Sequence, residues 1–300
     1  MMLQTTDLWK RYGRNDALRA VNLSVPAGSA FALIGTNGAG KTTLIKTLMN
    51  LLEPSRGTAS VLGTDSRKLA PREFAQIGYV AESQEMPRRF TVGQYLDYLR
   101  PLYATWDRQL ELVILRQLRL PLDRRIRDLS HGMRMKMALA CALPFRPKLL
   151  VLDEPFSGLD PLMRDELMEG LLRQAGEMTV LVSSHELAEI EAVVTHIGFL
   201  DEGRLLLQES MSDLTGRIRE VRVTLEQAAA LPLQIPKDWL QVRALGNVLS
   251  FIDTRFSADE LHARVNSLFS GIRDIDTQPV VLRSIFTTLA RAARDQGGAK

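Results

Sequence analysis

The sequence predicts an α/β fold built on a mostly parallel sheet, with a helical insertion and a small C-terminal α+β domain. Short apolar runs, which are typical of buried strands, alternate with amphipathic helical stretches through the first two thirds of the chain. One such strand leads through a glycine-rich loop into a helix. After Gly216 the alternation of buried strands and helices gives way to a different pattern of apolar residues. Alternation of strands and helices favours parallel strands whose connecting helices cover the sheet.

Composition sets broad limits on the kind of protein. The 300 residues, 45% of them hydrophobic and 24% charged, are typical of a globular chain with a sizeable core. No apolar run approaches the roughly 18 residues that a membrane-spanning helix needs, and the first residues lack the order of a secretory signal. Cys141 is the single cysteine and excludes an internal disulfide, so we expect a cytoplasmic protein in which Cys141 is a small core residue.

The charge pattern does not indicate a nucleic-acid partner. The net charge is only +3, and no long block of Lys and Arg with interleaved aromatic residues is present. Short basic pairs such as Arg88-Arg89 and Arg124-Arg125 are interpreted as solvated surface, because these side chains are seldom buried.

The strands and helices of the first domain are predicted from its apolar runs and amphipathic stretches. The strand Ala30–Ile34 precedes the glycine loop, and an amphipathic helix runs from Lys41 to Met49. Further buried strands are predicted at Ile77–Val80, Leu149–Leu152, Val180–Ser183 and Ile197–Leu200, and further helices at Leu162–Gln174 and Glu186–Val194. These elements belong to a predicted first domain of residues 1–215.

Two regions depart from this alternation. Residues from about 86 to 146 form a helical insertion, with Thr91 as a candidate N-cap for Val92–Leu102 and a second helix at Trp106–Leu118. Residues 216–300 are predicted to form an accessory or regulatory α+β domain. Its elements are strands at Glu220–Leu225, near Gln241–Val242 and at Val248–Ile252, and a helix at Ala258–Phe269.

A phosphate-binding loop is predicted where the first buried strand ends. The residues in question are Gly35, Thr36, Asn37, Gly38, Ala39, Gly40, Lys41, Thr42 and Thr43. Gly-x4-Gly-Lys-Thr between a strand and a helix is the Walker A pattern: glycines let backbone N–H groups converge on phosphate oxygens, and the helix presents its positive end to the same anion. Lys41 is expected to reach the β and γ phosphates, and the Thr42 hydroxyl to bind Mg²⁺.

A pair of carboxylates follows the buried run Leu149–Leu152. Asp153 and Glu154 at the end of a buried strand match the Walker B arrangement, in which Asp153 would hold Mg²⁺ and Glu154 would polarise the attacking water. Alone, such a pair is more often a turn or the start of a helix. Its place after a phosphate loop favours the catalytic interpretation.

Together these motifs resemble the ATP-binding-cassette (ABC) ATPases over residues 2–215, in particular the subunits of bacterial ABC-2-type export systems. Leu129-Ser130-His131-Gly132-Met133 resembles the family signature LSGGQ, and Ser157-Gly158-Leu159-Asp160 resembles the D-loop. His185 matches the switch histidine, and Tyr12 the aromatic residue that stacks on adenine. The resemblance implies an ATPase that uses ATP and Mg²⁺, with Lys41, Glu154 and His185 in catalysis and with Tyr12, Ser130, Gly132 and Asp160 at the nucleotide.

Two motifs differ from the family pattern. Glu82 stands where the family has its Q-loop glutamine. A carboxylate can still accept a metal-bound water, so Glu82 is expected at the nucleotide and at Mg²⁺. In the signature, His131 and Met133 replace Gly and Gln, whereas Ser130 and Gly132 remain to meet the γ-phosphate of the opposite subunit.

The resemblance also implies partners. A chain with one set of motifs is expected to dimerise with itself or with a second ABC ATPase subunit, and to serve an integral membrane permease at the inner face of the cell membrane. Tyr95, Tyr98, Leu99 and Tyr103 either line an exposed groove for a permease helix or pack in the core.

The direction of transport is suggested by the C-terminal segment. Residues 276–286 resemble the tail of cassettes that serve bacterial export permeases, which favours an exporter. The alternative is a soluble ABC ATPase that acts on ribosomes or nucleic acid, without transport. An inactive ATP-binding regulator is a third interpretation, and the presence of both Glu154 and His185 argues against it.

Overall fold

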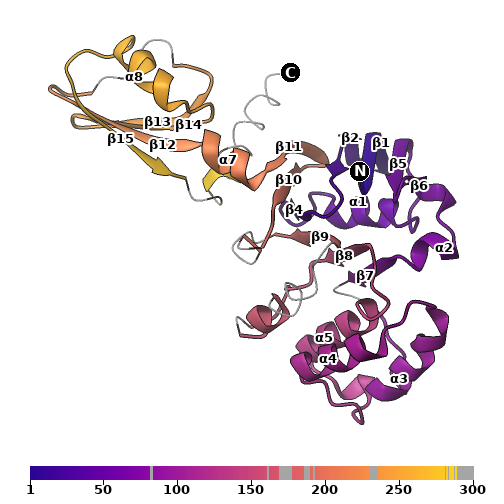
Figure 1. The fold of residues 1–300 in the computed structure, drawn as a ribbon. Coiled ribbons are helices and arrows are strands. Elements are labelled where there is room, and N and C mark those ends of the chain that lie inside the picture. The colour runs from indigo at the N-terminus through magenta and orange to yellow at the C-terminus, as the bar shows by residue number, and fades with distance from the viewer. Residues whose placement is uncertain are drawn as a thin grey trace. The chain divides into compact units, whose positions relative to one another are not determined.

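The chain divides into two units, Met1–Gln208 and Glu209–Lys300 (Figure 1). This division lies earlier in the chain than the boundary expected after residue 215. The computed structural model describes residues 1–81, 84–160, 162–168, 178–185, 190–191, 193–229, 231, 235–280, 282, 284–286 and 288. Among these residues, no helix combines the length and the apolar character that crossing a membrane requires.

A six-stranded sheet forms the centre of the first unit, in the order β11-β10-β4-β9-β8-β7. Its strands are β4 (Ala30–Ile34), β7 (Ile77–Ala81), β8 (Leu149–Asp153), β9 (Thr179–Ser184), β10 (His196–Asp201) and β11 (Arg204–Ser210). The five from β10 to β7 pair in parallel, which confirms the predicted parallel sheet. Because apolar residues in these strands are buried on both faces, the strands appear in the sequence as continuous apolar runs.

A second, antiparallel sheet in the first unit was not predicted. It comprises β1 (Leu3–Tyr12), β2 (Asn15–Val21), β3 (Ser24–Val25), β5 (Arg56–Val61) and β6 (Thr64–Asp65), with path β2-β1-β5-β6 and β3 paired to β1. Leu3, Leu8 and Val61 of this sheet pack in the same core cluster as Leu44 and Leu48 of α1 (Lys41–Leu48). Helix α1 therefore joins the core of this sheet to that of the parallel sheet.

The predicted helical insertion is confirmed as a group of helices, α3, α4 and α5 in Figure 1. The elements are α3 (Val92–Leu99), η2 (Arg100–Leu102), α4 (Arg108–Leu118), η3 (Ile126–Asp128) and α5 (His131–Ala142), preceded by η1 (Ser66–Lys68) and α2 (Pro71–Phe74). The stretch predicted as one helix to Leu102 changes to a 3₁₀ turn after Leu99, since Pro101 has no N–H for the α-helical ladder. Helix α4 starts later than predicted because Asp107 caps it, accepting from Leu110 N at 2.9 Å.

The start of α3 yields a testable prediction. Thr91 Oγ1 accepts from Gln94 N at 3.2 Å and Gln94 Oε1 accepts from Thr91 N at 2.9 Å, a reciprocal capping box. We expect Thr91→Ala to destabilise this helix by about 1 kcal/mol, seen as faster hydrogen exchange of the α3 amides. Thr91→Ser keeps the hydroxyl and serves as the control. Equal exchange in the Ala and Ser variants would contradict the assignment.

The second unit is an antiparallel sheet with a helix, as the α+β pattern indicated. Its elements are α7 (Met211–Arg217), β12 (Arg219–Leu225), β13 (Trp239–Leu245), β14 (Val248–Asp253), α8 (Ala258–Asn266) and β15 (Ile272–Pro279), with strand order β13-β14-β12-β15. Trp239 stacks on Phe251 with ring centroids 3.8 Å apart, and both rings share a core cluster with Leu261 and Val265 of α8. This unit thus has a hydrophobic core of its own.

Candidate functional site

The carboxyl ends of the parallel strands bring the predicted motifs to one edge of the sheet. Ile34 at the end of β4 is in register with Ser184 of β9, and Asp153 at the end of β8 is in register with Ser183. The glycine loop, the paired carboxylates and His185 all follow directly from these strand ends. In parallel α/β sheets this edge is where ligands bind.

The glycine loop needs glycine at two positions for steric reasons. A Cβ on Gly35 would lie 2.3 Å from Leu200 O, and one on Gly40, which has φ of 106°, would lie 2.6 Å from Ala17 O. Helix α1 begins after Gly40 with no side-chain cap and no acidic residue in its first turn. The first amides of α1 are therefore left for an anion, and the positive end of the helix adds to its attraction.

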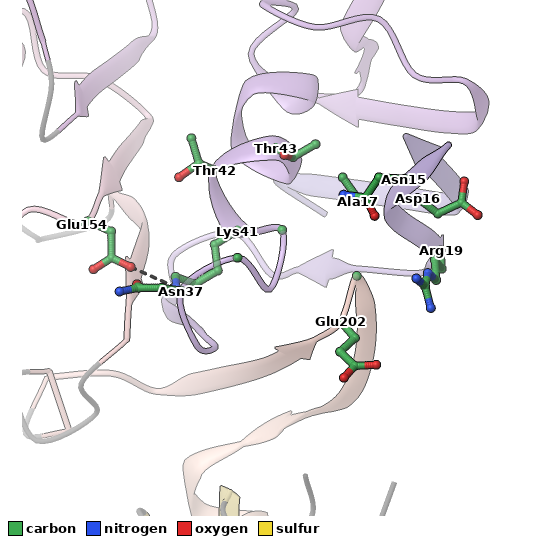
Figure 2. Close-up of a pocket in the computed structure, with 13 residues that line it drawn as sticks. Asn15, Asp16, Ala17, Arg19, Asn37, Lys41, Thr42, Thr43, Glu154 and Glu202 are labelled. Carbon is green, nitrogen blue, oxygen red and sulfur yellow. Dashed lines mark ion pairs between the residues drawn. The ribbon is translucent and has the colours of Figure 1, made fainter. Parts of the chain in front are cut away.

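Lys41, Glu154 and His185 are in direct contact. Lys41 Nζ, on a side chain only 5% exposed, donates to Gly35 O at 2.6 Å and Thr36 O at 3.2 Å, and lies 3.0 Å from Glu154 Oε1. The second carboxylate oxygen, Glu154 Oε2, lies 2.8 Å from His185 Nδ1. Figure 2 shows Lys41 and Glu154 reaching toward each other across the site. The three residues predicted to be catalytic thus form one chain of contacts.

Asp153 is buried beside two hydroxyl groups. Its Oδ1 accepts from Ser183 Oγ at 2.7 Å and from Thr42 Oγ1 at 3.2 Å. Burial raises the pKa of Asp153, and burial together with the charge of Asp153 raises the pKa of Tyr79 to about 12. A buried carboxylate next to a threonine hydroxyl is an oxygen donor set that suits Mg²⁺, which takes one or two carboxylates plus phosphate oxygens.

A cleft of about 460 Å³ opens over the glycine loop, within the usual size range of ligand pockets. Its lining comes from four segments: Asn15, Asp16, Ala17 and Arg19; Asn37, Gly38, Gly40, Lys41, Thr42 and Thr43; Glu154; Glu202 and Gly203 (Figure 2). The first and last segments were missed by sequence reasoning, because they belong to β2 and to the turn before β11, which carry no motif. Gly35, Thr36 and Ala39 complete the loop without lining the cleft.

The signature residues lie apart from this cleft. Ser130 caps α5, its Oγ accepting from Met133 N at 3.2 Å, and Gly132 faces Met163, whose Cγ would lie 3.1 Å from an added Cβ. Asp160 Oδ1 accepts from Met163 N at 2.9 Å. Ser130, Gly132 and Asp160 are absent from the described cleft lining, so the structure does not bring them to the residues of the glycine loop.

Three further predicted positions have different outcomes. Tyr12, at the end of β1, is 46% exposed, with Lys10 Nζ 5.2 Å from its ring centroid, and it does not line the cleft. Glu82 lies outside the described residues. His131, which replaces a glycine of the signature, places Nε2 3.0 Å from Ser157 O and so ties the start of α5 to the D-loop segment.

Comparison with known proteins identifies relatives of the first unit. The family model for "ABC transporter" matches residues 18–157. The lantibiotic transport ATP-binding protein SrtF of Streptococcus pyogenes is 34% identical over 211 residues, covering 69% of this chain and 90% of that protein. The bacitracin transport ATP-binding protein BcrA of Enterococcus faecalis is 32% identical over 226 residues, covering 73% and 72%.

Two more similarities extend this result. The Nod factor export ATP-binding protein I of Cupriavidus metallidurans is 32% identical over 220 residues, covering 71% of this chain and 72% of that protein. A solved structure described as the ATP binding subunit of an ABC transporter superposes with a TM-score of 0.65 at 30% identity, covering 72% of this chain and 92% of that chain.

Proposed function

This chain belongs to the ABC transporter family and is an ATPase, and we propose that it is the ATP-hydrolysing subunit of a multi-subunit exporter that powers a separate membrane permease. The observation that carries the proposal is the contact chain Lys41–Glu154–His185, two members of which line the glycine-loop cleft. The names of the three relatives, for lantibiotic transport, bacitracin transport and Nod factor export, support transport and favour export. We place the subunit in the cytoplasm, on the inner face of the membrane.

Each site residue has a distinct role in this proposal. The glycine-loop amides and Lys41 bind the β and γ phosphates, Glu154 polarises the attacking water, and His185 holds Glu154 in line. Thr42 and Asp153 would hold Mg²⁺, which when bound neutralises phosphate charge. Because Lys41 already touches Glu154, the bound γ-phosphate stands next to the carboxylate that acts on the water.

We propose that the active form is a dimer. Ser130 is exposed and does not line the cleft of its own chain, so its hydroxyl is available to the nucleotide of a second subunit. Gly132, in the next turn of chain, is buried against Met163 and positions the start of α5 that carries Ser130. A homodimer with two-fold symmetry is the simplest arrangement in which each subunit completes the site of the other.

The face proposed to receive the permease lies on the helical insertion. Tyr98 is 57% exposed and stacks on Tyr95 with ring centroids 6.3 Å apart, with exposed Phe90 beside them. Tyr103 instead stacks on Phe145 with centroids 4.1 Å apart and so belongs to the packing of the insertion. The exposure of Tyr98 supports the groove interpretation for that residue, and the stacking of Tyr103 supports core packing.

Two basic pairs flank this aromatic face. The loops that carry Arg88-Arg89 and Arg124-Arg125 lie side by side, since Thr91 bridges to Arg125 and Ile126 N donates to Phe90 O at 2.9 Å. All four arginines are exposed. Aromatic residues and arginine are the types enriched at protein interfaces, so the face suits a permease helix with apolar and acidic residues.

The proposal is tested by purifying the tagged chain from the membranes of its native cells and identifying the integral membrane proteins that copurify with it. We expect wild type to copurify with a membrane permease, and Tyr98→Glu to reduce the yield of the complex at least about tenfold, because a charge buried without a partner weakens an interface strongly. Leu245→Glu, at an 84% exposed apolar residue of the second unit, is the matched control. Copurification with ribosomes or nucleic acid instead would favour a non-transport ABC ATPase.

A further inference from the structure

Ser183 is a buried residue of β9 that touches both members of the carboxylate pair. Its side chain is 0% exposed. Its Oγ donates to Asp153 Oδ1 at 2.7 Å and accepts from the backbone N–H of Glu154 at 2.9 Å. A hydroxyl has one donor and can accept at its lone pairs, so a single group joins the two carboxylate residues of the site.

The contact with Glu154 bears on backbone conformation. Glu154 has φ of 52°, a left-handed conformation that costs a non-glycine residue free energy and that the surrounding structure must hold in place. The Ser183 hydroxyl satisfies the N–H of Glu154 in this conformation. The side chain of Glu154 extends from that backbone to Lys41 and His185. The direction of its carboxylate therefore depends on the left-handed backbone conformation of Glu154.

The contact with Asp153 fixes a carboxylate that burial makes costly to ionise. The Ser183 donation favours the charged form and holds Oδ1 on the side where Thr42 Oγ1 also donates. The two strands are in register at this point, with Asp153 opposite Ser183. The position of the hydroxyl is therefore set by the parallel sheet rather than by a loop.

We propose that Ser183 is a positioning residue for ATP hydrolysis, which aligns Asp153 toward Mg²⁺ and Glu154 toward the attacking water. This inference rests on the proposed function. It predicts that the hydroxyl of Ser183 matters for turnover and for the metal-dependent part of nucleotide binding. It also predicts no effect on metal-free nucleotide binding, which depends on Lys41 and the glycine loop.

The test compares Ser183→Ala with Ser183→Thr and Thr179→Val in the full-length chain. Thr179 is a matched control: its buried Oγ1 accepts from Gly28 N at 2.8 Å, and it lies at the opposite end of β9. Like Ser183→Ala, Thr179→Val removes one buried hydroxyl that bonds a backbone N–H. Steady-state ATP hydrolysis gives kcat and KM, and the fluorescence of a methylanthraniloyl-ATP probe gives nucleotide affinity with EDTA and with Mg²⁺.

We expect Ser183→Ala to lower kcat about tenfold and to reduce the gain in affinity from Mg²⁺ by a similar factor, as for loss of a hydrogen bond to a charged group. Its affinity in EDTA should stay within about twofold of wild type, and Ser183→Thr should restore both properties. If Ser183→Ala does not fold, Ser183→Cys, which keeps the unbranched side chain but has a larger atom that forms only weak hydrogen bonds, takes its place. The proposal would be overturned if Ser183→Ala and Thr179→Val had equal kcat and an equal increase in nucleotide affinity on addition of Mg²⁺. A wild type that does not hydrolyse ATP would instead overturn the proposed function itself.

Discussion

Glu154→Gln should retain ATP binding and lose at least about 99% of ATP hydrolysis, since a general base typically contributes a hundredfold or more to a rate. The amide keeps the size of the carboxylate and can still contact Lys41 and His185, whose atoms lie 3.0 Å and 2.8 Å from the two oxygens. It cannot accept a proton from water. With ATP bound and not hydrolysed, the variant should accumulate as the closed dimer, visible as an ATP-dependent shift in gel filtration.

Glu53→Gln is the matched control for this experiment. Glu53 is exposed and does not line the cleft, so the variant makes the same chemical change away from the nucleotide. The control should keep hydrolysis within about twofold of wild type, as expected away from special features. Unchanged turnover in Glu154→Gln would remove Glu154 from the proposed role.

Lys41→Ala should weaken ATP binding by at least about a hundredfold. Lys41 Nζ is buried and is aimed along the glycine loop, where the phosphate chain would lie, and charge-assisted hydrogen bonds to phosphate are about twice as strong as neutral ones. Several such contacts would be lost together. Binding can be measured by isothermal calorimetry, or as the rise in Tm on addition of ATP.

The control for Lys41→Ala is Lys46→Ala in the same helix. Lys46 does not line the cleft, so this variant loses the same charge from α1 without touching the site. A Lys41 variant that binds ATP as tightly as the Lys46 variant would mean that the cleft is not the nucleotide site.

The parallel core of the fold could be predicted because each of its strands is buried on both faces. Such strands leave a continuous apolar run in the sequence, as in Ala30–Ile34 and Leu149–Asp153. The antiparallel sheet leaves no such run: β1 changes register between Leu8 and Lys10, and Asp7 has φ of 45°. These irregularities break the alternation by which a half-buried strand is predicted.

The residues of the candidate site likewise fall into those that the sequence could predict and those that it could not. Lys41, Thr42, Asp153 and Glu154 occur in contiguous motifs whose residue types state the chemistry, so they could be predicted from local sequence. Ser183, like Arg19 and Glu202, reaches the site only because separate strands are brought into register. Position in the folded sheet, and not residue type, marks them as part of it.

The ion pair between Lys41 and Glu154 means that Glu154 competes with the γ-phosphate of the nucleotide for Lys41. The buried Lys41 ammonium lies 3.0 Å from the Glu154 carboxylate, so a γ-phosphate that binds Lys41 competes with an anion of the protein itself. The observed affinity for nucleotide then equals the intrinsic affinity multiplied by the fraction of molecules in which Lys41 is not paired with Glu154. A neutral residue at position 154 would remove that internal anion, so tighter nucleotide binding should accompany the loss of hydrolysis.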